Sequence, residues 1–529
     1  MYRRVLLLEL AKNQCTRLFP SAKMRDTLVK TTPLLPQQIA TPLSKDSGRN
    51  GQSTWTHARR LVGCALVVAW MLYSLRTWNY SQSNVDSFYA SITNPKNICP
   101  ATAGPAISHS GHIGLRGDSE DAPKRLFFWY FEAEHDAENA PTILTVGGGP
   151  GSSGLMNPML AQGPCLIAEN GTISNPNRWT EHFNLIALDH PVGAGFSYGT
   201  LVNNSRSAAI DVYDFLQKFY RLFPHLAKNQ FILSGGSYGG MYIPHIATVI
   251  HEQNTALAAG KGQTGAVHIN LESMMVSNPV SDATSYYGWM LQTRCYNVPD
   301  MYNASTCAEL FELLPTCLDS IRLAQQGPEW KAERHAAAHK TCLRIQDGDR
   351  HGTVIEDVRK KCYDTGPKAC LPPSFGRADA FFNQATIKDA LGIPERVNFA
   401  VLNEAVIDEF EKYGDKIQAA HLLYEPLLAA GIRLMHYVGA QDANCAWPGV
   451  LSFLRLIRSP FQEEFLRTAD VPWPTAEDAT VRVVGEGAGN MTYILVHQGG
   501  HFVAGDQPKL VKSIVDHWVQ NVPFVSSSN

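Results

Sequence analysis

The sequence lacks the marks of several protein classes. Its 45 Lys and Arg are matched by 48 Asp and Glu, a formal net charge of -3, so the basic excess of nucleic-acid-binding proteins is absent and we expect no nucleic-acid partner. With a single long apolar run, it is not a polytopic membrane protein. It has no C-x-x-C pair and no internal repeat, so neither a zinc site nor a repeat architecture is expected. Its 529 residues, 44% of them hydrophobic, are typical of an enzyme-sized globular body.

The single apolar run, Leu61–Leu75, lies between Arg60 and Arg76. Its fifteen residues are few for a membrane-spanning helix, which needs about 17–25. Two interpretations stay open: a signal anchor with a cytosolic tail, or a cleaved signal sequence behind a long leader. We expect a disordered basic tail at 1–58, the signal anchor or signal sequence at 59–78, and a globular domain at 79–529.

Charge and glycosylation motifs favour the anchor. Residues 1–60 hold eleven Lys/Arg against three Asp/Glu, which indicates a cytosolic side. The Asn-x-Ser/Thr motifs, which are candidate glycosylation sites, all follow the apolar run: Asn79, Asn170, Asn203, Asn303 and Asn490. The sequence therefore predicts a type II protein of the secretory pathway, bound to the membrane through its anchor, with a lumenal or extracellular main domain. The alternative is a secreted or vacuolar protein after signal cleavage.

Nine of the eleven cysteines follow the apolar run, and six of these fall between residues 295 and 370. This density is typical of a disulfide framework formed in a secretory compartment. Six cysteines allow fifteen pairings, so the pairing stays open. Because nine is odd, at least one thiol stays free, and Cys445 is our candidate for it, as a buried cysteine without a catalytic role.

Short apolar runs bounded by Gly and Pro predict strands. They are Leu126–Phe131, Thr142–Val146, Asn184–Leu188, Gln230–Leu233, Met274–Val276 and Arg433–Val438. Ile210–Leu222 and Met241–Ile250 are predicted helices between them. This alternation predicts an α/β fold with a mainly parallel central sheet flanked by helices. Residues 282–380 interrupt it, so we interpret them as a Cys-rich insertion, with a separate small domain as the alternative.

Two glycine-rich segments indicate catalysis. Segment 235–239, GGSYG, stands between a predicted strand and a predicted helix. A G-x-S-x-G in that context predicts a nucleophile elbow, a strained turn that holds the Ser237 hydroxyl clear of the backbone. Upstream, segment 147–151, GGGPG, follows a predicted strand. Its backbone amides can approach a reacting carbonyl closely, which indicates an oxyanion hole; a phosphate loop would need a following Gly-Lys-Ser/Thr.

A carboxylate and an imidazole complete a candidate catalytic set. Asp442 lies in GAQDANCAWPG and His501 lies in QGGHFVAGDQP, each after a strand-like run. The order Ser, Asp, His is that of α/β hydrolases, and loops after strands are where catalytic groups collect. His497 lies four residues before His501, but Gly499 and Gly500 disfavour the helix that a metal-binding pair needs. We interpret His497 as structural or exposed.

Five segments resemble motifs of the serine carboxypeptidase family of α/β hydrolases. They are GGGPG at 147–151, DHPVGAGFSY at 189–198, GGSYGGMYIP at 235–244, GAQDANCAWPG at 439–449 and GGHFVAGDQP at 499–508. They occur in the family's order, within a match from about residue 99 to 520. The resemblance implies an α/β-hydrolase fold and a serine hydrolase without a metal or cofactor.

By this resemblance Ser237 is the nucleophile, His501 is the general base and acid, and Asp442 orients the imidazole. The amides of Gly149 and Tyr238 would form the oxyanion hole. The amide of Gly148 would remain as a donor to the substrate's carboxylate.

The chain departs from the family where that carboxylate is bound. The Asn of the family's N-G-G-P-G is Gly147, the Glu before the nucleophile is Gly236, and the Glu of an upstream E-L-G-P is Ala161. Nearby, a family Trp is Thr145 and a frequent Cys is Ser152. The two Glu side chains are thought to share a proton with the substrate, which favours acidic pH. We therefore expect a weakened clamp and a pH optimum nearer neutral, governed by a histidine of ordinary pKa about 6.5.

The resemblance implies a carboxypeptidase that releases C-terminal residues from peptides through an acyl-enzyme on Ser237. The departures keep open an acyltransferase or esterase that uses the same triad on acyl-ester substrates. A non-catalytic binding protein is the third hypothesis. The oligomeric state is not indicated.

Overall fold

The computed structural model describes residues 88–525, except 104–106, 300, 328, 347–351 and 363–369. The predicted basic tail at 1–58, the segment 59–78 and Asn79 lie outside the described residues. Among the residues described, no helix combines the length and the apolar character that crossing a membrane requires. From Phe88 onward the chain folds as one unit.

Within the described residues, one twelve-stranded sheet forms the centre, in the order β1-β2-β3-β7-β4-β9-β10-β11-β14-β13-β12, with β8 paired to β3. Its middle consists of six parallel strands: Asn184–Leu188 (β7), Thr142–Val146 (β4), Phe231–Gly236 (β9), Leu271–Ser277 (β10), Arg433–Gly439 (β11) and Met491–Val496 (β14). Antiparallel strands form the two sides: Ala90–Thr93 (β1), Ser108–Gly114 (β2), Lys124–Phe131 (β3), Tyr198–Gly199 (β8), Val471–Pro472 (β12) and Ala479–Val484 (β13). Cys165–Ala168 (β5) and Gly171–Ser174 (β6) pair separately. The predicted mainly parallel sheet is confirmed.

The six predicted strands all occur, two of them with unchanged ends. The run predicted from Gln230 begins at Phe231 and continues to Gly236, because the glycines before the elbow still pair with β10. Strands β1 and β2 were not predicted. The β2 sequence SHSGHIG has too few apolar residues to show an alternating pattern.

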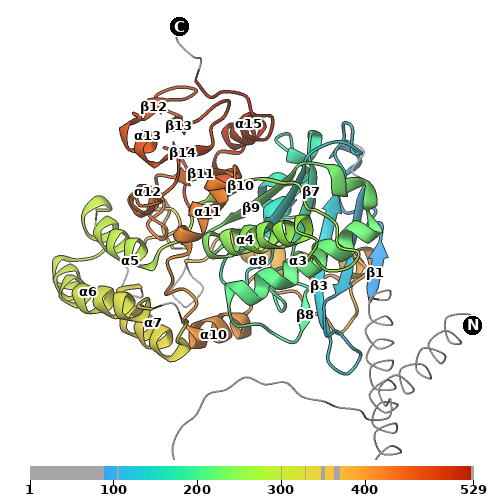
Figure 1. Ribbon diagram of the computed structural model, residues 1–529, viewed down its shortest axis with the longest axis horizontal. Coiled ribbons are helices and arrows are strands. Elements are labelled where there is room, and N and C mark those ends of the chain that lie inside the picture. The colour runs from blue at the N-terminus through green and yellow to red at the C-terminus, as the bar shows by residue number, and fades with distance from the viewer. Residues whose placement is uncertain are drawn as a thin grey trace, which may run out of the picture. The chain divides into compact units, whose positions relative to one another are not determined.

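Helices cover both faces of the sheet (Figure 1). They are Ser205–Leu222 (α3), Gly239–Ala258 (α4), Ala283–Gln292 (α5), Ala304–Ala324 (α6), Ala332–Gln346 (α7), Pro373–Phe382 (α8), Ala385–Ala390 (α9), Glu404–Tyr413 (α10), Tyr424–Ala429 (α11), Trp447–Leu454 (α12), Gln462–Arg467 (α13), Val503–Asp506 (α14) and Pro508–Val519 (α15). A hydrophobic core lies on each face of the sheet, and alternate side chains of β3 point into one or the other. Phe128 packs on Phe219 of α3, and Phe127 packs on Phe196 on the other face. With both faces covered, the parallel strands are buried, as such sheets require.

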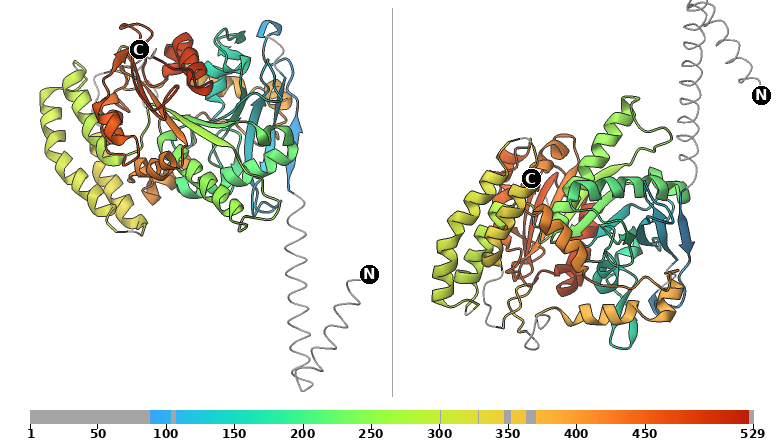
Figure 2. Two further views of the ribbon diagram at one scale, coloured as in Figure 1. Left: turned by 45° about the horizontal axis from the view of Figure 1, so that its top comes forward. Right: turned by 90° about the horizontal axis from the view of Figure 1, so that it is seen from below.

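The described residues of the segment 282–380 form helices and contribute no strand to the central sheet. Helices α6 and α7 lie side by side at the opposite end of the sheet from β1 (Figure 2). The six clustered cysteines pair among themselves, as Cys295–Cys307, Cys317–Cys342 and Cys362–Cys370, and a fourth disulfide joins Cys99 to Cys165. Cys445 is free and buried, as predicted. Whether the segment is an insertion or a small domain stays a prediction.

We expect the Cys317–Cys342 disulfide to stabilise the α6–α7 pair. It closes a loop of 25 residues, for which loss of chain entropy in the unfolded state corresponds to about 3–4 kcal/mol. Urea unfolding of C317S/C342S measures this loss. The matched control is C362S/C370S, whose 8-residue loop predicts a smaller loss of about 2–3 kcal/mol. A larger destabilisation in the control pair would contradict the loop-entropy explanation.

Candidate active site

Loops at one edge of the sheet carry the candidate residues. The six middle strands are parallel, so the loops after their carboxyl ends gather at the edge where α/β proteins bind ligands. These loops contain Gly147 after β4, Asp189 after β7, Ser237 after β9, Asn278 after β10, Asp442 after β11 and His501 after β14. The topology thereby collects residues that are far apart in the sequence.

Ser237 occupies the sharp turn between β9 and α4. Its φ is 58°, a left-handed conformation that is uncommon for a residue with a side chain. Its amide donates to the Ser277 carbonyl at 3.1 Å, and its carbonyl accepts from the Gly240 amide at 2.9 Å. Strained backbone persists only where the surroundings hold it, and it clusters at functional sites. The turn places Ser237 in the wall of a pocket.

His501 and Asp442 are directly hydrogen-bonded. The imidazole Nδ1 and the carboxylate Oδ2 are 2.7 Å apart, and the two residues are 8% and 1% exposed. Asn278 Nδ2 donates to the same Oδ2 at 2.7 Å. The amides of Asn444 and Cys445 donate to Oδ1 at 2.7 and 3.0 Å. This acceptor-only carboxylate fixes the imidazole with its proton on Nδ1, which leaves Nε2 as the basic nitrogen.

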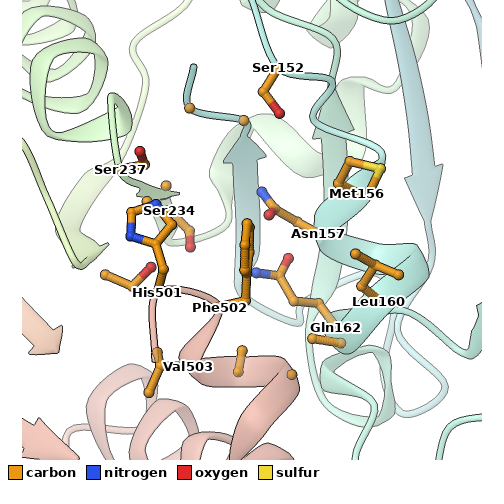
Figure 3. Close-up of a pocket in the computed structure, with 18 of the residues that line it drawn as sticks. Ser152, Met156, Asn157, Leu160, Gln162, Ser234, Ser237, His501, Phe502 and Val503 are labelled. Carbon is orange, nitrogen blue, oxygen red and sulfur yellow. The ribbon is translucent and has the colours of Figure 1, made fainter. Parts of the chain in front are cut away.

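Ser237 and His501 line the same pocket and lie on one side of it in Figure 3. Among the described contacts, no hydrogen bond joins the Ser237 hydroxyl to the imidazole. Such bonds are often long before a substrate is present and tighten in the complex. The structure thus brings the three predicted triad residues to one place.

The electrostatic surroundings of His501 change its acidity. Burial alone lowers the pKa of the imidazole, but the Asp442 carboxylate and the adjacent Cys445 sulfur together raise that pKa well above its usual value. Burial also raises the pKa of the Cys445 thiol. A buried thiol of raised pKa is inert, in agreement with the predicted non-catalytic role of Cys445.

We expect kcat/KM to rise with pH through the neutral range. The raised pKa keeps His501 as an imidazolium, which cannot accept the Ser237 proton, until the pH exceeds that value. The expectation of an ordinary histidine pKa of about 6.5 is therefore wrong for His501, because the Asp442 charge raises it, and the rising limb should lie above that value. A pH series with an ester substrate measures this limb, because the ester adds no titrating carboxyl. A sharp optimum below about pH 5 would contradict the expectation.

The glycine-rich loop 147–151 lies against the elbow. A Cβ on Gly148 would be 2.8 Å from Ser237 Cβ, so the loop backbone approaches the candidate nucleophile closely. Gly149 has a φ of 103°, which L side chains rarely adopt. Within the described residues, the amides of Gly149 and Tyr238 donate no hydrogen bond, so both are available to a developing oxyanion.

Two buried carboxylates brace the loop and the elbow. Asp189 accepts from the Ser153 hydroxyl at 2.5 Å and from the Phe196 amide at 2.7 Å, and burial raises the pKa of Asp189 to about 7. Asp415 accepts from the Tyr238 hydroxyl at 2.8 Å. These contacts preorganise the loop and the residue after Ser237, as electrostatic stabilisation of a transition state requires.

The pocket beside Ser237 has a volume of about 110 Å³. Opposite Ser237 and His501, its other side is formed by Asn157, Leu160 and Gln162 (Figure 3). None of the described residues that line it is Asp, Glu, Lys or Arg. His501 is therefore the one histidine among the described residues that line it.

The three positions where the expected carboxylate ligands are missing all line this pocket: Gly147, Ala161 and Gly236. A Cβ on Gly147 would be 2.2 Å from the Ser152 carbonyl oxygen, so the backbone itself leaves no space for a side chain there. A Cβ on Gly236 would be 2.6 Å from Ser277 Oγ. At Gly147 the departure is thus built into the backbone packing, and at Gly236 the Ser277 side chain occupies the adjacent space.

The sequence analysis did not identify the residues that support the acid and histidine loops. Arg294 is fully buried, and its Nε donates to the Ala443 carbonyl at 2.9 Å. The Glu356 carbonyl accepts from the His501 amide at 2.6 Å. Only Asn278 had a usable signal, as a polar residue directly after a buried parallel strand. The other two act across long sequence separations that no local pattern reports.

The side chains of Asp442, Cys445 and His501 offer ligand atoms within 4.8 Å of one another, a spacing that a metal ion could use. The carboxylate oxygen and the imidazole nitrogen closest to each other are already joined by a hydrogen bond. A zinc ion would have to replace that bond. The geometry therefore favours a charge-stabilised imidazole over a metal centre.

A family model described as serine carboxypeptidase matches residues 100–521. The chain belongs to the serine carboxypeptidase family. Carboxypeptidase Y homolog A of Neurospora crassa is 30% identical over 433 residues, covering 80% of this chain and 74% of the relative. The homolog from Podospora anserina is 30% identical over 418 residues, covering 78% and 72%. These matches confirm the predicted family.

The fold agrees with a solved structure. The prohormone-processing carboxypeptidase Kex1(Δ)p of Saccharomyces cerevisiae superposes with a TM-score of 0.66 at 20% identity, covering 82% of this chain and 96% of that one. The predicted α/β-hydrolase fold is confirmed. As a family member, the chain is a serine hydrolase with serine carboxypeptidase function. Its four disulfides agree with folding in the secretory pathway.

Proposed function

We propose that the enzyme releases C-terminal residues from peptides through an acyl-enzyme on Ser237. The observation that carries this proposal is the His501–Asp442 hydrogen bond beside the pocket that Ser237 lines. A nucleophile, a base and a group that orients the base are the three parts that acyl transfer needs.

In the first half-reaction, Ser237 Oγ attacks the scissile carbonyl and His501 Nε2 accepts the hydroxyl proton. The amides of Gly149 and Tyr238 bind the oxyanion of the tetrahedral intermediate. The intermediate collapses when His501 returns its proton to the leaving nitrogen. The C–N bond breaks, and the peptide's remaining acyl group stays as an ester on Ser237.

In the second half-reaction, His501 takes a proton from water, which attacks the Ser237 ester. A second tetrahedral intermediate forms at the same oxyanion hole and expels Ser237 Oγ, which regains its proton from His501. The shortened peptide leaves with a new carboxylate. Asp442 stabilises the imidazolium in both halves, in agreement with its effect on the His501 pKa.

A second candidate function is ester hydrolysis or acyl transfer through the same acyl-enzyme. The observation that favours it is the uncharged lining of the pocket, where Gly147, Ala161 and Gly236 supply no side-chain ligand for a carboxylate. An enzyme of this kind would accept an alcohol leaving group or acceptor as well as an amine.

Progressive shortening of a peptide tests the proposal. The full chain, produced in a secretory host, is incubated with an unblocked peptide, and products are followed by mass spectrometry. We expect successive losses of single C-terminal residues. The same peptide with a methyl-esterified C-terminus is the matched control for the second candidate: release of methanol without loss of residues would favour esterase chemistry over peptidase chemistry.

We also propose that the protein is anchored as a type II membrane protein with the catalytic unit on the lumenal or extracellular side. The basic residues before Leu61–Leu75 and the later glycosylation motifs support this orientation. Asn170 and Asn303 are exposed, whereas Asn203 and Asn490 are partly buried. Resistance to carbonate extraction together with a glycosidase-sensitive mass supports an anchor. Recovery of the mature chain in the soluble fraction would instead support signal cleavage.

A further inference from the structure

The side of the pocket opposite Ser237 belongs to the leaving residue. The three positions at which the family's carboxylate ligands would stand line this one pocket, together with Ser237 and His501. If the proposed function holds, the α-carboxylate of the residue to be released must lie here. Its hydrogen-bond partners must then come from other residues of the same wall.

Gln162 is the side chain in this wall with unused hydrogen-bonding capacity. It is 5% exposed. Its Oε1 is fully buried and accepts no hydrogen bond, whereas its Nε2 is not among the fully buried atoms and donates no hydrogen bond to any described residue. In Figure 3 it points from the short helical turn Pro158–Gln162 (η2) into the pocket, toward Phe502. Buried polar groups are almost always hydrogen-bonded, so a buried carboxamide without partners, aimed into an active-site pocket, indicates a ligand.

The carboxamide of Asn157, in the same wall, differs from that of Gln162 because it has hydrogen-bond partners within the protein. Asn157 Nδ2 donates to Thr145 Oγ1 at 2.7 Å and to the Val146 carbonyl at 2.9 Å, so both of its N–H groups are used within the protein. Thr145 stands where the family has Trp. Asn157 therefore has a structural role beside β4, whereas the two N–H groups of Gln162 remain available to a ligand.

The backbone under Gln162 is held firmly. Asn175 Nδ2 donates to the carbonyls of Ala161 and Gly163, the residues on either side, at 2.7 and 2.8 Å. The Gly163 amide donates to the Pro158 carbonyl at 2.8 Å. The Cys99–Cys165 disulfide fixes the strand that follows. A side chain on such a support is preorganised, as a specificity site needs to be.

Apart from His501, the charged side chains near Gln162 line an adjacent cavity and not the pocket itself. Within the pocket, the titratable lining residues of the described set are His501 and Tyr437, and burial raises the pKa of Tyr437 to about 12. An adjacent cavity shares Leu160, Phe502 and Gly505 with the pocket, and its charged lining residues are Glu356, Asp357, Lys360, Arg377 and Asp506. Lys360 is paired with both aspartates, at 2.9 and 3.1 Å. No described Asp or Glu lines the pocket in which a substrate carboxylate would meet Gln162.

We propose that Gln162 Nε2 donates a hydrogen bond to the α-carboxylate of the leaving residue and so selects substrates with a free C-terminus, in the ionised form. This assignment rests on the proposed function. A carboxamide donor does not have to share a proton with the ligand, so the ionised carboxylate stays bound as the pH rises through neutral toward the range in which His501 can accept a proton.

The test compares an N-blocked dipeptide as its free acid and as its methyl ester, with the full chain, from pH 5 to pH 8. The variants are Gln162→Met, which keeps the volume and removes the amide, Gln162→Glu, and Arg377→Ala. We expect Q162M to raise KM for the free acid by roughly 10-fold to 100-fold, the usual effect of losing one hydrogen bond to a charged group, and to leave KM and kcat for the ester unchanged. Both substrates are followed at the same peptide bond, through release of the second residue as its free acid or as its methyl ester, so the acyl part is shared and an altered fold would affect both.

Q162E provides the second arm. Its carboxylate would oppose the substrate carboxylate, so KM for the free acid should be near the wild-type value at pH 5 and rise as the pH increases. An unchanged acid-to-ester ratio in Q162M and Q162E overturns the assignment, and a ratio that falls only in R377A assigns the role to Arg377. Wild-type enzyme that turns over neither substrate overturns the proposed function itself, and this assignment with it.

Discussion

Replacement of Ser237 by alanine is expected to lower kcat by about 10⁶-fold. The hydroxyl is the attacking group, and the Cys445 thiol near His501 is not expected to replace it, because that thiol is buried and of raised pKa. The elbow is held by backbone hydrogen bonds of Ser237, which alanine keeps. The folded state should therefore survive, and the thermal midpoint should match that of the wild type.

The measurement is turnover of the ester substrate together with labelling by an organophosphonate that reacts with active-site serines. Wild type should incorporate one label at Ser237, and S237A should incorporate none. Ser234→Ala is the matched control, because Ser234 lines the same pocket and is not in the proposed triad. It should keep its label and its activity. Turnover of S237A close to that of the wild type would contradict the role of Ser237.

Replacement of Asp442 by asparagine is expected to lower kcat by about 10⁴-fold. The carboxylate accepts from His501 Nδ1, and an amide nitrogen in its place would favour the tautomer with Nδ1 unprotonated. Nε2 would then carry the proton and could not act as the base. Asn278 donates to the same oxygen, so the atom at this position has to be a hydrogen-bond acceptor.

A pH series separates this explanation from a loss of fold. The Asp442 charge raises the pKa of His501, so its removal should move the rising limb of kcat/KM to lower pH while the plateau falls. A variant that was merely partly unfolded would lower the plateau without moving the limb. An unmoved limb in a fully folded D442N would contradict the proposed pairing.

The sequence predicts those parts of the site that lie in contiguous motifs. The elbow around Ser237 is one strand, one turn and one helix, and its glycines mark the turn whatever lies around it. Asp442 and His501 stand in similar motifs directly after strands, so their convergence follows once the strands are parallel. An odd cysteine count predicts at least one free thiol without a structure, and the structure shows that Cys445 is free.

The parts that it does not predict depend on contacts across the fold. Gln162 lies beside Ala161 in a short turn without periodicity, and its unpaired amide becomes visible only when the surrounding atoms are placed. Arg294 supports the acid loop across 149 residues of sequence. In the sequence, Gly147 indicates only that a ligand side chain is missing. In the structure, the Ser152 backbone occupies the space that a side chain at this position would need.

The pocket suggests how a carboxypeptidase can work without its family's acidic clamp. Without the two carboxyls that the family pattern implies, no shared proton is needed at the substrate's carboxylate. The Asp442 carboxylate and the Cys445 sulfur raise the pKa of His501, so the base acts at higher pH. A site that binds an ionised carboxylate suits that pH range.

The most direct test of this account is the ratio of kcat/KM for an N-blocked dipeptide as free acid to that for its methyl ester, measured with wild-type enzyme at pH 5 and at pH 7.5. The account predicts a preference for the free acid that is as large at pH 7.5 as at pH 5. A ratio at or below one at both pH values would contradict it, and would identify the enzyme's chemistry as that of an esterase or acyltransferase within the family.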